Sequence, residues 1–315
     1  MKPQHLRTFL AVAEHRSIRA AARALFVSQP AVTRTMRELE SDLDIPLLRR
    51  SVTGIELTEA GAAFQARASL LLEEMRRTRE ELRFMKEGGY GHVSVAMTST
   101  VGLTLLAGAL ERFGRQMPQA RVSISEDASP AALRKLQNGT LDFAIANIGP
   151  DGLSAEFSTR PLFLMHMVAG ARVGHPLAAA TSIRQLQDQL WVVPSLGREF
   201  LSQLFVPRGL EVPPRIIECE SFAIAAHLMA RMDLLGFFSA ALFEQELAPL
   251  GVSALPLRET FQAAEVGIVT LRDSRLTPMA HCLMECIQAQ PLPAGMEAAG
   301  KRRGTRIARQ SGSGQ

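Results

Sequence analysis

A short segment of the chain places side chains that can read DNA bases at helical spacing. Between residues 28 and 43, apolar side chains recur on one side of a helix and polar side chains on the other. The polar side carries Gln29, Pro30, Thr33, Arg34 and Arg37. Arginine can form two hydrogen bonds to guanine, and glutamine can form two to adenine. The pattern predicts a base-reading helix, and an ordinary solvated surface helix is the alternative.

Two earlier helices and two turns position this segment. Apolar spacing predicts one helix over residues 4–14 and a second over 18–25, with Ser17 as its N-cap. Ser28 caps the third helix, and Pro30 lies in its first turn, where a missing N–H costs nothing. A helix, a short turn and a helix form the arrangement that places the later helix in a DNA major groove.

A small hairpin follows the third helix. Residues 45–50 and 55–57 read as two short strands around Thr53-Gly54, which predicts a β-wing. Arg49 and Arg50 would meet the phosphate backbone, which supplies affinity and salt dependence but no sequence choice.

The first sixty residues resemble the DNA-binding segment of LysR-type transcriptional regulators. The motifs that carry the resemblance keep the family's order and spacing: Ser28-Gln29-Pro30-Ala31-Val32, Leu39-Glu40, Pro46-Leu47, Arg50 and Leu57-Thr58-Glu59-Ala60-Gly61. The resemblance implies that Gln29, Pro30, Thr33 and Arg34 contact bases or the adjacent backbone, and that Arg37 and Arg50 contact phosphates. Thr53 and Glu56 depart from the family pattern, because many members carry basic residues there. The resemblance therefore does not extend to the basic residues with which the wing tip would contact the minor groove.

A long helix connects this unit to the rest of the chain. Thr58 is a natural N-cap, and heptad spacing continues to the Gly88-Gly89 pair. The side chains of the seam, apolar except for Thr78, are Phe64, Ala68, Leu71, Met75, Thr78, Leu82 and Met85. So regular a seam favours dimerisation over packing within the chain, and family members pair through the matching helix.

Strands and helices alternate through residues 88–290. The order from residue 92 to residue 146 is βαβαβ, which is typical of a mostly parallel open sheet. We expect two α/β lobes, the first over about 90–162 and 266–290 and the second over about 163–265. Phe113 to Pro118, Leu136 to Asp142 and His175-Pro176-Leu177 extend the family resemblance, which implies a sensor similar to periplasmic solute-binding proteins.

The predicted organisation has four parts. They are a winged helix-turn-helix domain over 1–58, a linker helix over 59–87, a two-lobed effector domain over 88–290 and a disordered basic tail over 291–315. The fold class is thus an α/β main body with an α-rich N-terminal unit.

Ligands of two-lobed α/β proteins bind in the crevice beyond the strand ends. Polar side chains at predicted strand ends are therefore candidate effector contacts, together with one aromatic residue: Thr98, Ser99, Thr100, Ser129, Asn147, Ser195, Gly197, Arg198, Ser221 and Phe222. Helix N-termini and Arg198 favour an anion, such as a carboxylate or a sulfonate. The alternative is that the Ser and Thr residues are simple N-caps.

Composition excludes several classes of protein. The 315 residues include 47% hydrophobic ones, which argues against a disordered chain, and no apolar run reaches the length of a membrane span. The net charge of +4 hides an asymmetry, since residues 88–290 hold 15 basic against 18 acidic side chains. Three cysteines and a polar N-terminus predict a cytoplasmic protein without disulfides.

No enzyme is expected. The sequence has no Gly-x-Ser-x-Gly elbow, no P-loop and no HExxH motif. Cys282 and Cys286 lie near His281 and Glu285, but the pattern favours helix packing over a metal or redox site.

The sequence predicts a transcription regulator that binds promoter DNA and responds to a small anionic effector, without a cofactor or a membrane. Self-association as a homodimer is expected, and the resemblance implies a homotetramer and contact with RNA polymerase. Two alternatives stay open: a constitutive architectural DNA-binding protein, and an enzyme with a DNA-binding appendage.

Overall fold

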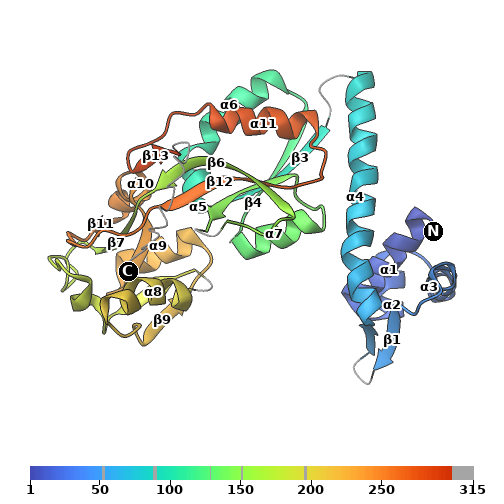
Figure 1. Ribbon diagram of the computed structural model, residues 1–315, viewed down its shortest axis with the longest axis horizontal. Helices are drawn as coiled ribbons and strands as arrows, with labels where there is room; N and C mark the ends of the chain where they lie inside the picture. Colours follow the sequence, from blue (N-terminus) through green and yellow to red (C-terminus); the bar gives the residue numbers. More distant parts are fainter. Residues whose placement is uncertain (52–53, 88–90, 128, 150–151, 195–196, 300–315) are drawn as a thin grey trace, which may run out of the picture.

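A computed structural model describes residues 1–51, 54–87, 91–127, 129–149, 152–194 and 197–299. Figure 1 shows a small helical unit at one end of a long helix and an α/β body beside the other end of that helix. The body consists of two lobes, each built on its own sheet. This architecture confirms the predicted fold class.

The N-terminal unit is a winged helix-turn-helix. Its elements are α1 (Pro3–His15), α2 (Ile18–Ala24), α3 (Gln29–Leu43), β1 (Leu48–Ser51) and β2 (Gly54–Leu57). Ser17 caps α2 by accepting a hydrogen bond from the Ala20 N–H at 3.3 Å, as its place before the helix predicts. The strands β1 and β2 pair antiparallel. The wing and all three helices therefore form where the sequence predicts them.

The long helix α4 (Glu59–Glu87) is capped by Thr58, whose hydroxyl accepts a hydrogen bond from the Gly61 N–H at 2.9 Å. The predicted seam divides into two parts. Ala68 is fully buried in the core of the N-terminal unit, and the ring of Phe64 packs on Phe9 with centroids 5.1 Å apart. Four later members are exposed: Leu71, Met75, Leu82 and Met85. Ala68 is therefore an intrachain core residue, because α4 lies against α1 along its first turns.

Lobe I has a six-stranded sheet in the order β13-β6-β12-β5-β3-β4. Its strands are β3 (Gly91–Met97), β4 (Ala120–Glu126), β5 (Phe143–Ile148), β6 (Phe157–Met165), β12 (Ala264–Leu271) and β13 (Met296–Ala298). Its helices are α5 (Ser99–Thr104), α6 (Leu106–Gln116), α7 (Ser129–Gln137) and α11 (Pro278–Gln288). Strands β3, β4 and β5 run parallel, and β12 is antiparallel to both β5 and β6. The sheet is therefore mixed, with the predicted βαβαβ unit as its parallel part.

Lobe II has a five-stranded sheet in the order β11-β7-β10-β8-β9. Its strands are β7 (Met167–Arg172), β8 (Leu190–Val193), β9 (Arg215–Glu218), β10 (Leu235–Ser239) and β11 (Val252–Ala254). Its helices are α8 (Gly197–Phe205), α9 (Phe222–Arg231) and α10 (Ala240–Leu242), with short turns η1 (Ile183–Leu186), η2 (Val206–Arg208), η3 (Phe243–Leu247) and η4 (Ala248–Leu250). Trp191 and Phe205 pack edge to face in its core.

Three details differ from the expectations. Strand β6 stays in the first sheet as far as Met165, so the first crossing between lobes lies at His166 rather than near residue 163. The first helix of the βαβαβ unit expected over residues 92–146 is broken at Leu105 into α5 and α6. Residues 296–298 of the expected disordered tail form β13, because Met296 is buried and the strand pairs with β6. The rest of that tail, 300–315, lies outside the described residues.

Candidate nucleic-acid interface and inter-lobe site

Helix α3 has one buried side and one polar side, as its periodicity predicts. Ser28 accepts a hydrogen bond from the Ala31 N–H at 3.4 Å and begins the helix. The buried side consists of Val32, Thr35, Met36 and Leu39. Because this side packs on α1 and α2, the opposite side faces away from the unit.

The polar side of α3 keeps its side chains accessible. Gln29, Pro30, Arg34 and Arg37 are exposed, and Thr33 is half-buried. The Arg34 side chain is 81% exposed, with its Nε 3.5 Å from a Glu38 oxygen. An exposed ion pair of this kind is worth little, so Arg34 can exchange it for a base or a phosphate. This face of α3 offers the donors that major-groove reading requires.

The two wing arginines differ. Arg49 forms an ion pair at 2.9 Å with Glu56, which lies directly opposite in the hairpin. Arg50 is exposed and forms no ion pair with another described side chain. Glu56, a departure from the family pattern, therefore neutralises one of the two predicted phosphate contacts. Thr53 lies outside the described residues.

Sequence reasoning missed how the wing is attached to α3. One carboxylate oxygen of Glu40 accepts from the Leu47 N–H at 2.8 Å and from the Leu48 N–H at 3.0 Å. These bonds satisfy two backbone donors at the start of β1 and hold the wing against α3. Glu40 was one of the family landmarks, which was the only signal for this role.

A second missed feature joins α4 to lobe I. Arg77 points from α4 into the lobe, where its guanidinium donates to the carbonyls of Gly139 and Leu141 at 3.2 and 2.9 Å and to Ser274 Oγ at 2.8 Å. It also lies 3.2 Å from the buried carboxylate of Asp142. Burial raises the pKa of Asp142, and the Arg77 charge and the Ser94 N–H oppose that effect. Arg77 is thus the main polar link between the DNA-binding unit's helix and the sensor.

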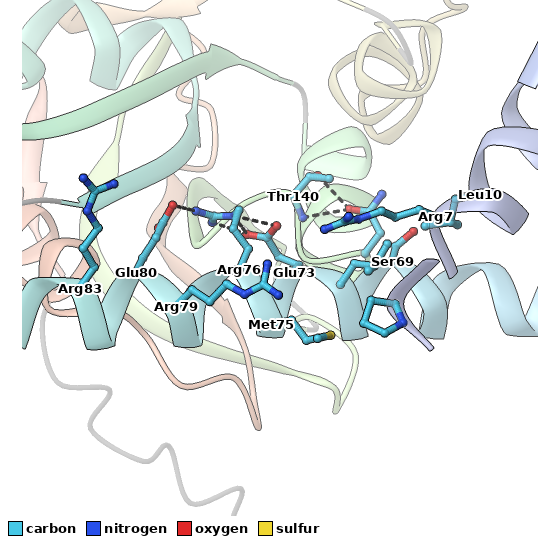
Figure 2. Close-up of a pocket in the computed structure, with 13 residues that line it drawn as sticks. Arg7, Leu10, Ser69, Glu73, Met75, Arg76, Arg79, Glu80, Arg83 and Thr140 are labelled. Atoms are coloured by element: carbon cyan, nitrogen blue, oxygen red, sulfur yellow. Dashed lines mark hydrogen bonds and ion pairs between the residues drawn. The ribbon is translucent and has the colours of Figure 1, made fainter. Parts of the chain in front are cut away.

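A cavity of about 520 Å³ lies beside this junction, between α1, α4 and the turn after α7 (Figure 2). Arg7, Arg76, Arg79 and Arg83 line it. Arg76 lies between Glu73 and Glu80 and pairs with both, as the dashed lines in Figure 2 show. A smaller cavity of about 200 Å³ lies at the crossing between the lobes and is lined in part by His166, Glu259 and Phe261. No predicted effector residue lines either cavity.

In lobe I, some of the predicted effector residues are buried or form hydrogen bonds within the protein. Ser99 Oγ donates to Glu126 at 2.5 Å. Thr98 Oγ1 is buried and has no partner among the described residues, and Thr100 is buried at the start of α5. Asn147 is exposed near the end of β5. The hydroxyl of Thr98 is therefore the least satisfied polar group of this set.

Carboxylates also end β4, a feature that the anion hypothesis did not include. Glu126 is the last residue of β4, and Asp127 follows it. Burial alone would raise the pKa of Asp127, but hydrogen bonds from Lys135 at 2.8 Å and from Ser125 outweigh it and lower the pKa. Among the described residues at this end of β4, Asp127 is paired with Lys135, whereas Glu126 accepts only the hydrogen bond from Ser99.

On the lobe II side, one predicted residue is part of the core. Phe222 is buried against Phe238, with ring centroids 5.4 Å apart, so its ring is used for packing within lobe II. Ser221 caps α9 by accepting from the Ile224 N–H at 3.4 Å. Gly197 is buried at the start of α8, and Arg198 beside it is exposed. Ser195 and the side chain of Ser129 lie outside the described residues.

The cysteines of α11 pack inside lobe I. Cys282 and Cys286 both belong to its core, and Gln116 contacts them from α6. Burial raises the pKa of Cys282 to about 11, so its thiol stays protonated at neutral pH. Within the part of the chain that is described, no cluster of three metal-ligating side chains occurs. In the same residues, no helix has the length and apolar character of a membrane span.

Two family profiles match this chain. The lysR family of bacterial regulatory helix-turn-helix proteins matches residues 3–62, and the LysR substrate binding domain matches residues 86–291. The transcriptional regulator GbpR of Azospirillum brasilense is 28% identical over 92% of this chain and 86% of its own length. The regulator TdcA of Escherichia coli K12 is 27% identical over 90% of this chain and 91% of its own.

Solved structures share the fold. A full-length OxyR from Pseudomonas aeruginosa matches with a TM-score of 0.65 and 22% identity, covering 96% of this chain and 99% of its own. Full-length CbnR in complex with its target DNA matches with a TM-score of 0.64 and 24% identity, covering 91% and 99%. The two relatives found by sequence, GbpR and TdcA, are transcriptional regulators, the class predicted for this chain. The chain belongs to the LysR family of DNA-binding transcriptional regulators and carries that family's effector-binding domain.

Proposed function

We propose that the polar side of α3 reads the promoter bases. This proposal rests on the polar face formed by Gln29, Thr33, Arg34 and Arg37. Their side chains do not belong to the core of the unit, and the ion pair of Arg34 is exposed. Arg37 and Arg50 would hold phosphates, and Arg49 would contribute less because Glu56 already pairs with it. Ser28 would act through the cap that orients the N-terminus of α3.

We infer that two copies pair through α4. Leu71, Met75, Leu82 and Met85 are exposed on one side of that helix, and water-exposed apolar side chains at heptad spacing gain free energy by packing on a second helix. A dimer would present two α3 helices to two half-sites. By analogy with the family, two dimers would form a tetramer that contacts RNA polymerase in the cytoplasm.

The effector of this regulator is, in our proposal, a small organic anion held between the lobes. The position of Arg198 supports an anionic ligand. Arg198 is an exposed cation at the N-terminus of α8, where backbone N–H groups also favour negative charge. The hydroxyl of Thr98, unpartnered among the described residues, would complete the site from lobe I. Binding would favour one arrangement of the lobes, and Arg77 would pass that bias to α4.

Calorimetric titration of the full chain with a panel of small carboxylates and sulfonates tests the effector site. The expected result is binding of at least one anion by wild type and a loss of about tenfold or more in affinity for Arg198→Ala. Arg231→Ala, at the C-terminal end of α9, is the matched control and should bind as wild type does. Equal affinity of wild type and Arg198→Ala would remove Arg198 from the site. Binding of no compound would favour a constitutive architectural protein.

A further inference from the structure

The turn between α2 and α3 holds an aromatic side chain that the fold does not explain. Phe26 is 96% exposed, the highest value for any large apolar side chain among the described residues. Its backbone is left-handed, with φ at 55°. A bulky side chain rarely adopts this conformation, and a ring in water gains nothing from packing. Both features disfavour phenylalanine at this position.

The backbone of the turn shows which residue would suit it better. The Val27 N–H donates to the Ala22 carbonyl at 3.0 Å, and the Phe26 N–H donates to the Arg23 carbonyl at 3.2 Å. This pair of bonds is the Schellman ending of a helix, in which the left-handed position usually holds glycine. The other two non-glycine residues with positive φ are the polar Arg16 and Asp44. Phe26 is the apolar exception among the described residues.

A strained backbone together with an exposed apolar side chain is typical of a residue that contacts a binding partner. Phe26 lies two residues before the cap of α3 and three before Gln29, the first polar residue of the base-reading side. Arg23 on the last turn of α2 and Val27, the next residue in the chain, are also exposed. An exposed apolar ring, three residues from an exposed arginine and three from the first residue of a helix, is complementary to the edge of a DNA groove, where phosphates flank apolar surface.

We propose that Phe26 is a DNA contact: its ring packs on the methyl group of a thymine, and on the adjoining deoxyribose, at the edge of the major groove. The proposal rests on the placement of α3 in that groove. Phenylalanine makes such apolar contacts with the thymine C5-methyl group, which marks A·T pairs in the major groove. The contact lies beside the base pairs that Gln29 and Arg34 reach and adds a thymine preference that hydrogen bonds do not supply.

Phe26→Gly separates this role from folding, because glycine removes the ring and suits the left-handed backbone. We expect the full-length variant to unfold at the wild-type temperature or above it, and to bind the promoter site about tenfold more weakly. Phe26→Leu keeps an apolar side chain and should lose less affinity. Val206→Ala shortens an exposed apolar side chain in lobe II and is the matched control, with unchanged DNA binding.

Replacing each thymine of the site by uracil identifies the partner of the ring, since uracil lacks only the methyl group. Wild type should lose affinity at one thymine of each half-site, and Phe26→Gly should not respond at that position. Wild-type affinity of Phe26→Gly, or the same response of both proteins to uracil at every position, would overturn the proposal. If Arg34→Ala also bound normally, the placement of α3 would fail as well, whereas weak binding by Arg34→Ala alone would leave that placement intact.

Discussion

Helix α3 and the inter-lobe region both present polar side chains near helix N-termini, but they use them differently. On α3, Arg34 and Arg37 extend outward, and Arg34 has only a weak exposed partner. At the predicted effector positions, the hydroxyls of Ser99 and Ser221 already have hydrogen-bond partners within the protein, and Phe222 is buried. A polar residue indicates a binding site only when the fold leaves it unsatisfied. Two arginines illustrate the difference. Arg77 is buried and all of its partners lie within the protein, whereas Arg34 is exposed and available to a partner molecule.

Among the substitutions considered, replacement of the buried Arg77 should have the largest effect, and that effect is on stability. Arg77→Ala leaves the Asp142 carboxylate buried without its cation, so the variant should lose about 3–5 kcal/mol of stability in urea unfolding followed by circular dichroism. Arg79→Ala, an exposed arginine two positions along α4, is the control and should change stability little. Comparable stability of the two variants would show that Arg77 is not a structural link.

Replacement of the exposed Arg34 should weaken DNA binding and leave the stability of the protein unchanged. Arg34→Ala should cost about 1–3 kcal/mol of binding free energy at one base position, because a bidentate contact to guanine is lost. Fluorescence anisotropy on a series of single-base variants of the promoter site measures this loss. Unchanged affinity and base preference would contradict the base-reading role of Arg34.

Ser221 tests the inter-lobe side of the comparison. Because its hydroxyl caps α9, Ser221→Ala should lower stability by about 1 kcal/mol and leave ligand affinity unchanged. Thermal unfolding and calorimetry on the same preparation give both values. A large loss of ligand affinity at normal stability would show that Ser221 is a ligand contact after all.

The smallest expected effect concerns the wing. Glu56→Gln releases Arg49 from its ion pair, which should change stability by less than about 1 kcal/mol. The freed Arg49 should strengthen DNA binding and make the logarithmic salt dependence of affinity steeper by up to about one unit. Anisotropy titrations at several salt concentrations measure the slope. An unchanged slope would mean that Arg49 stays away from the phosphates.

The elements near the DNA were predictable because their signals are local. The caps Ser17 and Ser28, the buried side of α3 and the hairpin all follow from neighbours within a few residues. The alternation of strands and helices likewise indicated a two-lobed α/β body, although not that β13 would extend its first sheet.

The remaining features depend on partners that are distant in the sequence. Arg77 resembles an ordinary surface member of an i,i+4 pair, but its hydrogen-bond acceptors in lobe I lie 62 to 197 residues away. Ala68 fits a dimer seam equally well in sequence, and only the docking of α1 assigns it to the intrachain core. The burial of Phe222 by Phe238 has the same origin. Local patterns show which face of an element is polar, but not what that face meets.

Footprinting of the promoter with the full chain tests the central claim of an effector-responsive regulator most directly. The compounds to add are those small organic anions that bind the chain by calorimetry. The account predicts that at least one of them changes the length or the position of the protected segment, and that Arg198→Ala shows no such change with it. An anion that binds with full affinity and leaves the footprint of wild type unaltered would contradict the account.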